Sequence, residues 1–183
     1  WFNFHLFKQA AAILTNPDLS KEQKNLLLTE LKTFKLPTGY ISPAWHPVNY
    51  SVTSLEDALK VVSKPWLVGF TEAEGSFYLV SKSKTRITHG FEITQKLDKI
   101  VLTAIGFILS IKVVEKKTYN TVVTTATKPI SIIIEYFKDT MKGIKSLEFR
   151  IWARSFYSQA KGPERYQYLY KTRQQMNKLK IKV

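Results

Sequence analysis

The chain has 183 residues, of which 44% are hydrophobic, and this length and composition suit one folded domain with smaller attached segments. No apolar stretch approaches about 18 residues, which excludes a membrane-spanning protein, and the lack of cysteine excludes disulfides and thiolate metal sites. A formal net charge of +14 predicts a polyanion as the partner, although the solvated surface of a ribosomal or membrane-associated protein would show the same excess.

The first 35 residues have the pattern of helices. Ser20 opens a helix start signal, and apolar residues recur after it at helical spacing. Residues 36–47 are rich in proline and predict a linker, and a short helix opened by Ser54 follows it. Because residue 1 is Trp rather than Met, we expect this chain to be processed, truncated or partly unobserved, which leaves a targeting peptide undecided.

The segment from Trp66 to Phe77 is the most informative part of the chain. Pro65 predicts the start of a buried helix over residues 65–74. Gly69 and Ala73, four residues apart, leave one face of this helix without bulky side chains, so a second helix could pack closely there. Glu74 ends the helix at its C-terminus, where the macrodipole does not favour a carboxylate, so we expect a divalent cation to hold it. An ordinary core helix is the alternative interpretation.

After Ser76 the hydrophobic pattern changes from helical to alternating. We expect a strand to residue 82, a basic turn over 83–86, a strand over 87–95, a helix over 98–109, a hairpin of strands over 111–115 and 119–125, a helix over 129–140 and two helices within 145–179. The order α-β-β-α-β-β-α predicts an α+β fold, with helices on one face of a four-stranded antiparallel sheet.

The other face of this sheet is expected to bind nucleic acid. Phe77 and Leu79 point one way and their neighbours the other, so the outward residues would reach base edges and phosphates if the curved ribbon lay in a major groove. Together with basic residues of the two hairpin turns, the candidate nucleic-acid-binding residues are Tyr78, Val80, Lys82, Lys84, Arg86, Glu92, Thr94, Lys116 and Lys117. Alternation alone predicts a merely solvated face equally well.

Residues 67–75, with the sequence Leu-Val-Gly-Phe-Thr-Glu-Ala-Glu-Gly, resemble the signature of the LAGLIDADG family of homing endonucleases and intron maturases. The resemblance spans about residues 65–160 and implies this fold, with the sheet as a DNA-binding saddle. It implies that Glu74, here in place of the usual Asp, binds a catalytic Mg²⁺ ion. It also implies a water-positioning residue at Gln95, a nearby basic residue at Lys99 and the active-site lysine at Lys145.

The terminal helices contain a weak internal repeat. It pairs Phe4 with Phe149, Phe7 with Trp152, Leu31 with Met176, Phe34 with Leu179 and Lys35 with Lys180. In two-signature members of the family each half ends in such helices. The resemblance therefore implies that residues 1–35 are the helical tail of a preceding LAGLIDADG half, 36–54 a linker, and 55–183 a LAGLIDADG domain with C-terminal helices.

A lone Glu74 also implies a partner, since two catalytic acids normally meet where two signature helices pair. A homodimer copy or a missing N-terminal half would supply the second acid. By the same resemblance we expect a mitochondrial, organellar location, and we expect no membrane partner.

The resemblance and the candidate residues imply two possible functions. The first is a site-specific, Mg²⁺-dependent double-strand DNA endonuclease of the intron-homing type. The alternative is a non-catalytic RNA-binding descendant, either an intron-splicing maturase or a component of an organellar ribosome. The absence of a first signature favours the alternative, whereas Glu74, Gln95 and Lys145 favour the nuclease. A generic basic scaffold protein would leave the signature unexplained.

Overall fold

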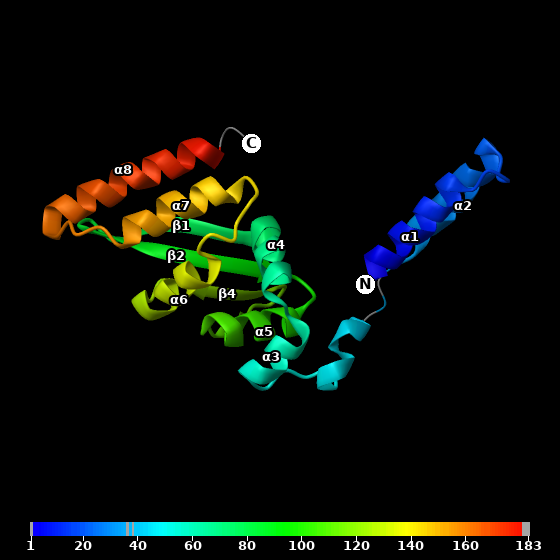
Figure 1. The fold of residues 1–183 in the computed structure, drawn as a ribbon, viewed down its shortest axis with the longest axis horizontal. Coiled ribbons are helices and arrows are strands. Elements are labelled where there is room, and N and C mark those ends of the chain that lie inside the picture. The colour runs from blue at the N-terminus through cyan, green and yellow to red at the C-terminus, as the bar shows by residue number, and fades with distance from the viewer. Residues whose placement is uncertain (1, 36, 38, 181–183) are drawn as a thin grey trace. The chain divides into compact units, whose positions relative to one another are not determined.

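The computed structural model describes residues 2–35, 37 and 39–180 (Figure 1). The chain divides into two compact units, Trp1–Tyr50 and Ser51–Val183. The division falls inside the linker expected at residues 36–54, of which residues 36 and 38 lie outside the described part. Among the described helices, none is long and apolar enough to cross a membrane.

The first unit consists of α1 (Phe2–Thr15), α2 (Lys21–Thr33) and a 3-10 helix, η1 (Pro43–Val48). Ser20 begins α2 as expected: its hydroxyl accepts the N–H of Gln23, and the Gln23 side chain accepts the N–H of Ser20, which is a capping box. The expected linker is therefore partly regular, because η1 lies within it. None of the residues of α2 is buried.

The second unit contains the sheet and most of the helices. Its elements are α3 (Leu55–Val61), α4 (Lys64–Glu74), β1 (Gly75–Ser83), β2 (Arg86–Gln95), α5 (Lys99–Leu109), β3 (Val113–Glu115), β4 (Asn120–Thr124), α6 (Thr127–Phe137), α7 (Lys145–Phe156) and α8 (Gly162–Lys180). The strands form one antiparallel sheet in the order β1-β2-β4-β3. The predicted α+β fold is confirmed.

The predicted boundaries differ from the observed ones for local reasons. β3 starts at Val113 rather than at residue 111, because the N–H of Ile111 closes the end of α5 on the carbonyl of Gly106. α6 starts at Thr127, before Pro129, since proline is tolerated in the first turn of a helix. α6 also ends at Phe137 rather than at residue 140, and Asp139 beyond it has a positive φ of 57°.

The core lies between the helices and one face of the sheet. α7 runs along β1, and α8 contacts both β1 and β2 (Figure 1). The ring of Phe77 on β1 lies 5.3 Å from that of Phe91 on β2 and 5.0 Å from that of Trp152 on α7, and all three residues are fully buried. Aromatic residues dominate the burial energy of such a core, so this cluster fixes α7 against the sheet.

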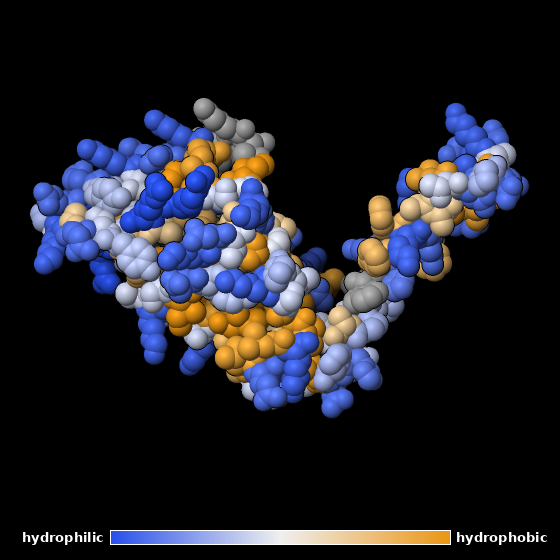
Figure 2. Space-filling model, in the orientation of Figure 1, coloured by the Kyte–Doolittle hydropathy of each residue, from blue (hydrophilic) through white to orange (hydrophobic). Residues whose placement is uncertain are grey.

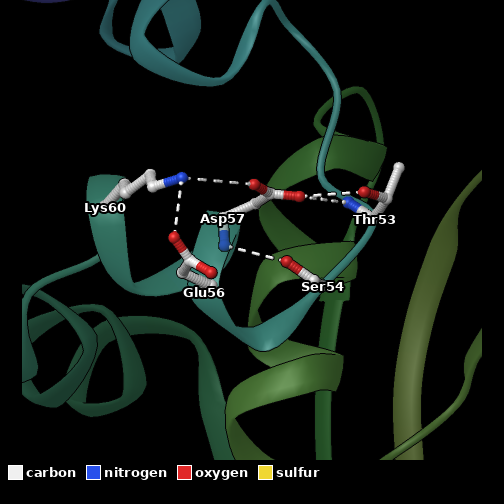
Figure 3. A network of polar contacts seen from close by, with 5 residues as sticks. All are labelled: Thr53, Ser54, Glu56, Asp57 and Lys60. Atoms are coloured by element: carbon white, nitrogen blue, oxygen red, sulfur yellow. Dashed lines mark hydrogen bonds and ion pairs between the residues drawn. The ribbon is translucent and has the colours of Figure 1, made fainter.

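A polar network starts α3 (Figure 3). Ser54 accepts the N–H of Asp57, and the Asp57 carboxylate accepts the N–H and the hydroxyl of Thr53 at 3.1 and 2.9 Å. The bonds from Thr53 hold the pKa of Asp57 below its usual range. Lys60 lies 3.1 Å from Glu56 and 3.8 Å from Asp57. These contacts set the start of α3, the helix that precedes α4.

Candidate functional site

Glu74 is the last residue of α4, and its side chain is exposed. Gly75 follows it in extended conformation, with φ −74°, and begins β1. A Cβ atom at Gly75 would lie 2.6 Å from both the carbonyl oxygen and Cγ2 of Thr71. Glycine is therefore needed for the close approach rather than for a left-handed turn. The direct change from helix to strand places Glu74 at the α4–β1 junction.

Lys145 reaches this junction from the first turn of α7. Its Nζ donates to the carbonyl oxygen of Ala73 at 3.2 Å, across 72 residues of sequence. A cation near the last carbonyl groups of a helix also interacts favourably with the helix dipole. The candidate lysine and the candidate acid therefore lie at the same end of α4.

Glu72 is a residue of this region that the sequence pattern did not single out. Its Oε1 accepts the N–H groups of Lys142 and Gly143 at 2.6 and 3.0 Å, and its Oε2 accepts that of Gly143 at 2.9 Å. Gly143, two residues before Lys145, was the one available sequence signal for this contact. Its partner Glu72 is 71 residues away in the chain. The two acids of the signature thus differ, since Glu72 binds the chain and Glu74 is exposed.

Gln95 is the last residue of β2, where it pairs with Asn120 of β4. Because Gly75 pairs with Ile93, the end of β2 lies at the same end of the sheet as the α4–β1 junction. Lys99, the first residue of α5, lies 2.5 Å from Glu115. Both side chains of that ion pair are more than half exposed, so the pair contributes little to stability. Lys99 can therefore leave Glu115 for another anionic group.

The free face of the sheet carries the residues expected to point outward. Burial alternates along β1 and β2, with Phe77, Leu79 and Ile93 on the buried side. The ring of Tyr78 covers Gly90, where a Cβ atom would overlap it. Burial and the nearby Glu92 carboxylate raise the pKa of Tyr78.

Hydroxyl groups hold the Glu92 carboxylate on this free face. Oε1 of Glu92 lies 3.3 Å from Oγ1 of Thr94 and 3.2 Å from Oγ1 of Thr121. Thr121 lies on β4, which is paired with β2 in register with Thr94. The free face therefore offers an acceptor group in a defined position.

Exposed cations flank this face. The β1–β2 turn is shorter than expected, Lys84 and Thr85 rather than residues 83–86, because β2 begins at Arg86. The exposed basic residues of the two hairpins are Lys82, Lys84, Arg86, Lys116 and Lys117. Such cations suit contacts with a phosphate backbone.

One face of α4 is open. Apart from its chain neighbours and the backbone of its own helix, no described atom lies within 4 Å of a Cβ built on Gly69, and Ala73 is exposed. Trp66 is 44% exposed and stacks on Phe70 with 4.8 Å between ring centroids. This face has the small residues and the free space that a closely packed second helix needs.

The described residues contain no group of three or more His, Cys, Asp or Glu side chains that could hold a metal ion. His89 is a packing residue: it is buried against the rings of Trp152 and Phe156, and its Nε2 lies 2.7 Å from the Ser155 hydroxyl. A metal site within the described residues must therefore rest on fewer than three such side chains.

Comparisons with known proteins converge on one family. Residues 67–156 match the model of the family described as LAGLIDADG endonuclease. A Schizosaccharomyces pombe protein described as "Probable intron-encoded endonuclease Cox1-I1b" is 38% identical over 164 residues, which are 85% of this chain and 40% of that protein. This chain thus spans about 40% of the length of its curated relative.

Solved structures share the fold. The LAGLIDADG meganuclease I-CpaMI bound to uncleaved DNA superposes with a TM-score of 0.64 at 18% identity, over 98% of this chain and 66% of that one. The archaeal intron-encoded homing endonuclease I-Vdi141I complexed with DNA has a TM-score of 0.55 at 24% identity, over 63% and 82% of the two chains. The homing endonuclease I-TnaI has a TM-score of 0.52 at 22% identity, over 67% and 88%.

Proposed function

This chain carries a LAGLIDADG endonuclease domain over residues 67–156, and from this premise we propose that it acts in a site-specific, metal-dependent double-strand DNA endonuclease of the intron-homing type. The observation that carries the proposal is the exposed Glu74 at the α4–β1 junction, with Lys145 bound to the adjoining carbonyl of Ala73. An intron-encoded endonuclease among the relatives and DNA complexes among the structural neighbours support it.

DNA is proposed to lie along the free face of the sheet. The outward residues of β1 and β2, with Glu92 held by hydroxyl groups, face the base edges in the major groove. The exposed lysines and Arg86 of the hairpins neutralise phosphates and set the register of the protein on the duplex. Sequence specificity therefore rests on the outward side chains and affinity on the cations.

Glu74 is proposed to hold Mg²⁺. Its carboxylate offers hard oxygen atoms and has neither a hydrogen bond nor an ion pair within the described part of the chain. Mg²⁺ keeps several waters and needs only one or two carboxylates beside the substrate phosphate, so one glutamate per half fits it. When bound, Mg²⁺ supplies an activated water and stabilises the charge that develops on the phosphate.

The other residues of the site are proposed to position the reactants. The Lys145 ammonium lies near the phosphate that Glu74 faces, where a fixed cation stabilises developing negative charge. Gln95, at the same end of the sheet, orients the attacking water by hydrogen bonding. Lys99 adds a second cation when its exposed pair with Glu115 opens.

A second LAGLIDADG half is proposed to complete the site, from a homodimer copy or from a preceding half of the same protein. The open face of α4 at Gly69 and Ala73 is the surface on which the second signature helix would pack. The aligned terminal helices differ in burial: Phe149 and Trp152 are 5% and 0% exposed, whereas Phe4 and Phe7 are 53% and 68% exposed.

The exposed phenylalanines favour the preceding half over the homodimer. Phe4 and Phe7 of α1 occupy the positions that the repeat aligns with Phe149 and Trp152 of α7, which pack against the sheet. We therefore propose residues 1–35 as the tail of a first half, 36–54 as the linker and 55–183 as the second domain. Residues 181–183 and the side chain of Lys180, which the repeat includes, lie outside the described part.

The direct test is cleavage of a library of duplex DNA by the purified protein together with the second half that completes its site. We expect double-strand breaks at one sequence in the presence of Mg²⁺ and none when the metal is chelated. Breaks at no sequence, or breaks that persist under chelation, would refute the proposal.

The name of the curated relative, which refers to an intron of Cox1, supports an organellar and specifically mitochondrial site of action.

RNA binding is a second candidate function, favoured by one observation. Exposed basic residues gather on α7 and α8 and on the chain between them. The other sides of both helices face the buried side of the sheet, away from its free face. The residues are Arg150 and Arg154 of α7, Lys161 between the helices, and Lys171 and Lys178 of α8. Figure 2 shows mainly hydrophilic residues over these two helices. If replacing these residues with Gln weakened binding to intron RNA and left duplex DNA binding intact, this surface would have its own nucleic-acid ligand.

A further inference from the structure

The Glu72 carboxylate turns from α4 toward the chain between α6 and α7, where it accepts the N–H groups of Lys142 and Gly143. Hydrogen bonds from N–H groups to an ionised carboxylate are about twice as strong as neutral ones. We propose that Glu72 and Gly143 form a clamp that positions Lys145 beside Glu74, and that this clamp acts on the rate of cleavage rather than on DNA affinity. The inference rests on the proposed endonuclease function.

Gly143 is the residue that allows the clamp to close. A Cβ atom at this position would overlap Oε2 of Glu72, with the other carboxylate oxygen 3.7 Å away. The backbone of Gly143 is thus near enough for its N–H to bond both carboxylate oxygens. Any side chain at position 143 must displace the carboxylate, so the need for glycine here comes from close approach.

Lys145 provides the second contact between the same two segments. Glu72 holds Lys142 and Gly143, and two residues further on Lys145 bonds the carbonyl of Ala73. Glu72 and Ala73 directly precede Glu74 on α4, so the two contacts fall on the two residues before the candidate metal ligand. This arrangement sets the position of the ammonium relative to the carboxylate of Glu74.

Few other contacts hold this part of the chain. Ile144 is 76% exposed, and no side-chain hydrogen bond caps the start of α7 within the described part of the chain. Met141 is buried, and the N–H of Ser146 bonds the carbonyl of Gly143, which fixes the ends of the segment. The position of the residues between these ends therefore depends on the Glu72 carboxylate.

Glu72 is a positioning residue in this proposal rather than a second metal ligand. Both of its oxygens accept backbone N–H groups, so binding a cation would break the contacts that hold Gly143. Displacing a reacting group by about 1 Å can cost about 100-fold in rate. Loss of the clamp should thus lower kcat through Lys145 while the free face of the sheet keeps its DNA contacts.

The test compares Glu72→Gln with Glu135→Gln, which changes an exposed glutamate on α6. With its oxygen in the place of Oε1, the amide of Gln puts an NH₂ donor in the place of Oε2. The N–H of Gly143 then loses one of its two bonds and faces a second donor. We expect Glu72→Gln to lower kcat by roughly 10- to 100-fold with KM for DNA within about threefold. Amide hydrogen exchange at residues 142 and 143 should accelerate in Glu72→Gln only.

Two double mutants test how the clamp acts. Gly143→Ala alone should reproduce Glu72→Gln, but added to Glu72→Ala it should cost nothing more, because the shortened side chain leaves room for the new methyl group. Glu72→Gln should likewise add no loss of kcat to Lys145→Met if the clamp acts through the lysine. Additive losses in either pair would overturn the proposal.

The exchange measurement separates this inference from the proposed function. A protein that cuts no DNA overturns the endonuclease function and the effect on kcat that depends on it. Unchanged exchange at residues 142 and 143 in Glu72→Gln overturns the clamp itself, even if the wild-type protein cuts DNA. Faster exchange with unchanged kcat would show a clamp without a role in positioning Lys145, which also refutes the proposal.

Discussion

Two glutamates two residues apart on α4 have different environments. Helical residues at this spacing do not face the same way, so Glu72 points to the chain before α7 while Glu74 is exposed at the helix end. The Glu72 carboxylate cannot take the place of the Glu74 carboxylate, because its oxygens already accept backbone N–H groups. Within this one signature, Glu72 is therefore a structural acid and Glu74 the candidate catalytic acid.

Replacing Glu74 with Gln should abolish Mg²⁺-dependent cleavage and leave nucleic-acid binding within a few fold. The amide keeps the size of the side chain but lacks the charge that holds a divalent cation. Cleavage of the selected DNA site and binding to it should be measured on the same preparation, with Glu135→Gln as the matched control. A Glu74→Gln protein that cuts normally would refute the role of Glu74.

His89 should make stability depend on pH. Burial, with a smaller contribution from the nearby Arg165 charge, lowers the pKa of His89 from 6.5 to about 4. Between these values the unfolded chain binds a proton that the folded chain does not, so the stabilisation is complete above pH 6.5 and is lost as pH falls to about 4. The free energy of unfolding should fall by roughly 3 kcal/mol across this interval.

Denaturant unfolding at a series of pH values measures this effect, with NMR of the His89 ring as a direct readout. His89→Gln should flatten the slope between pH 6.5 and 4, whereas His5→Gln, which changes an exposed histidine, should keep it. A His89 ring that titrates near 6.5 in the folded protein would contradict the prediction.

At the level of secondary structure, helix α4 has one side buried in the domain core and another side open. Leu67 and Thr71 are buried in the domain, while Gly69 and Ala73 face open space. The core aromatic cluster of β1, β2 and α7 does not involve this open face. A change on the open face of α4 should therefore affect partners of the domain rather than its folding.

Gly69→Leu tests the open face. The new side chain meets no atom within 4 Å of its Cβ, so the domain should fold with nearly unchanged stability. In a close helix seam the same side chain would overpack the contact, at a cost of typically ~1–3 kcal/mol, and would push the paired acids apart. We expect pairing of halves and cleavage to be lost together.

Analytical ultracentrifugation of the two halves as separate chains, DNA cleavage and thermal unfolding measure the three effects of Gly69→Leu. Gln175→Leu on α8 is the matched control, since it adds a leucine to an exposed helical position elsewhere. If Gly69→Leu kept both pairing and cleavage, the α4 face would not be a helix seam. A single chain acting through RNA binding would then be the better interpretation.

At the scale of the whole molecule, charge dominates the surface. The net charge is +14, and residues 142–182 contain eleven Lys or Arg against Glu148 and Glu164. Cations occur both at the hairpin tips beside the free sheet face and on α7 and α8, away from that face. The molecule therefore offers two basic surfaces, of which the proposed function uses the first.

Binding to duplex DNA should fall steeply with salt. Each phosphate contact releases counterions and contributes roughly −0.9 to the slope of log affinity against log salt. We expect a slope of several units between ~50 and ~200 mM salt, and a smaller one when Lys84 and Lys116 are both changed to Gln. The control changes Lys171 and Lys178 on α8, which should leave the duplex slope unaltered. A slope near zero would remove the polyanion partner.

The sequence by itself determined the order of elements, the sheet, the signature helix and the place of Glu74 at its end. These features follow from local information: hydrophobic period, caps such as Ser20, and a contiguous signature. Outward and inward residues of β1 and β2 could also be predicted, since alternation in a strand is a property of neighbouring residues.

Only the tertiary structure decided which distant groups meet. The bond of Glu72 to Gly143 spans 71 residues and that of Lys145 to Ala73 spans 72, and no local pattern encodes such pairs. The same holds for Lys99 with Glu115 and for Tyr78 over Gly90. These contacts exist because the aromatic core fixes α7 against β1, which brings the chain before α7 to the end of α4.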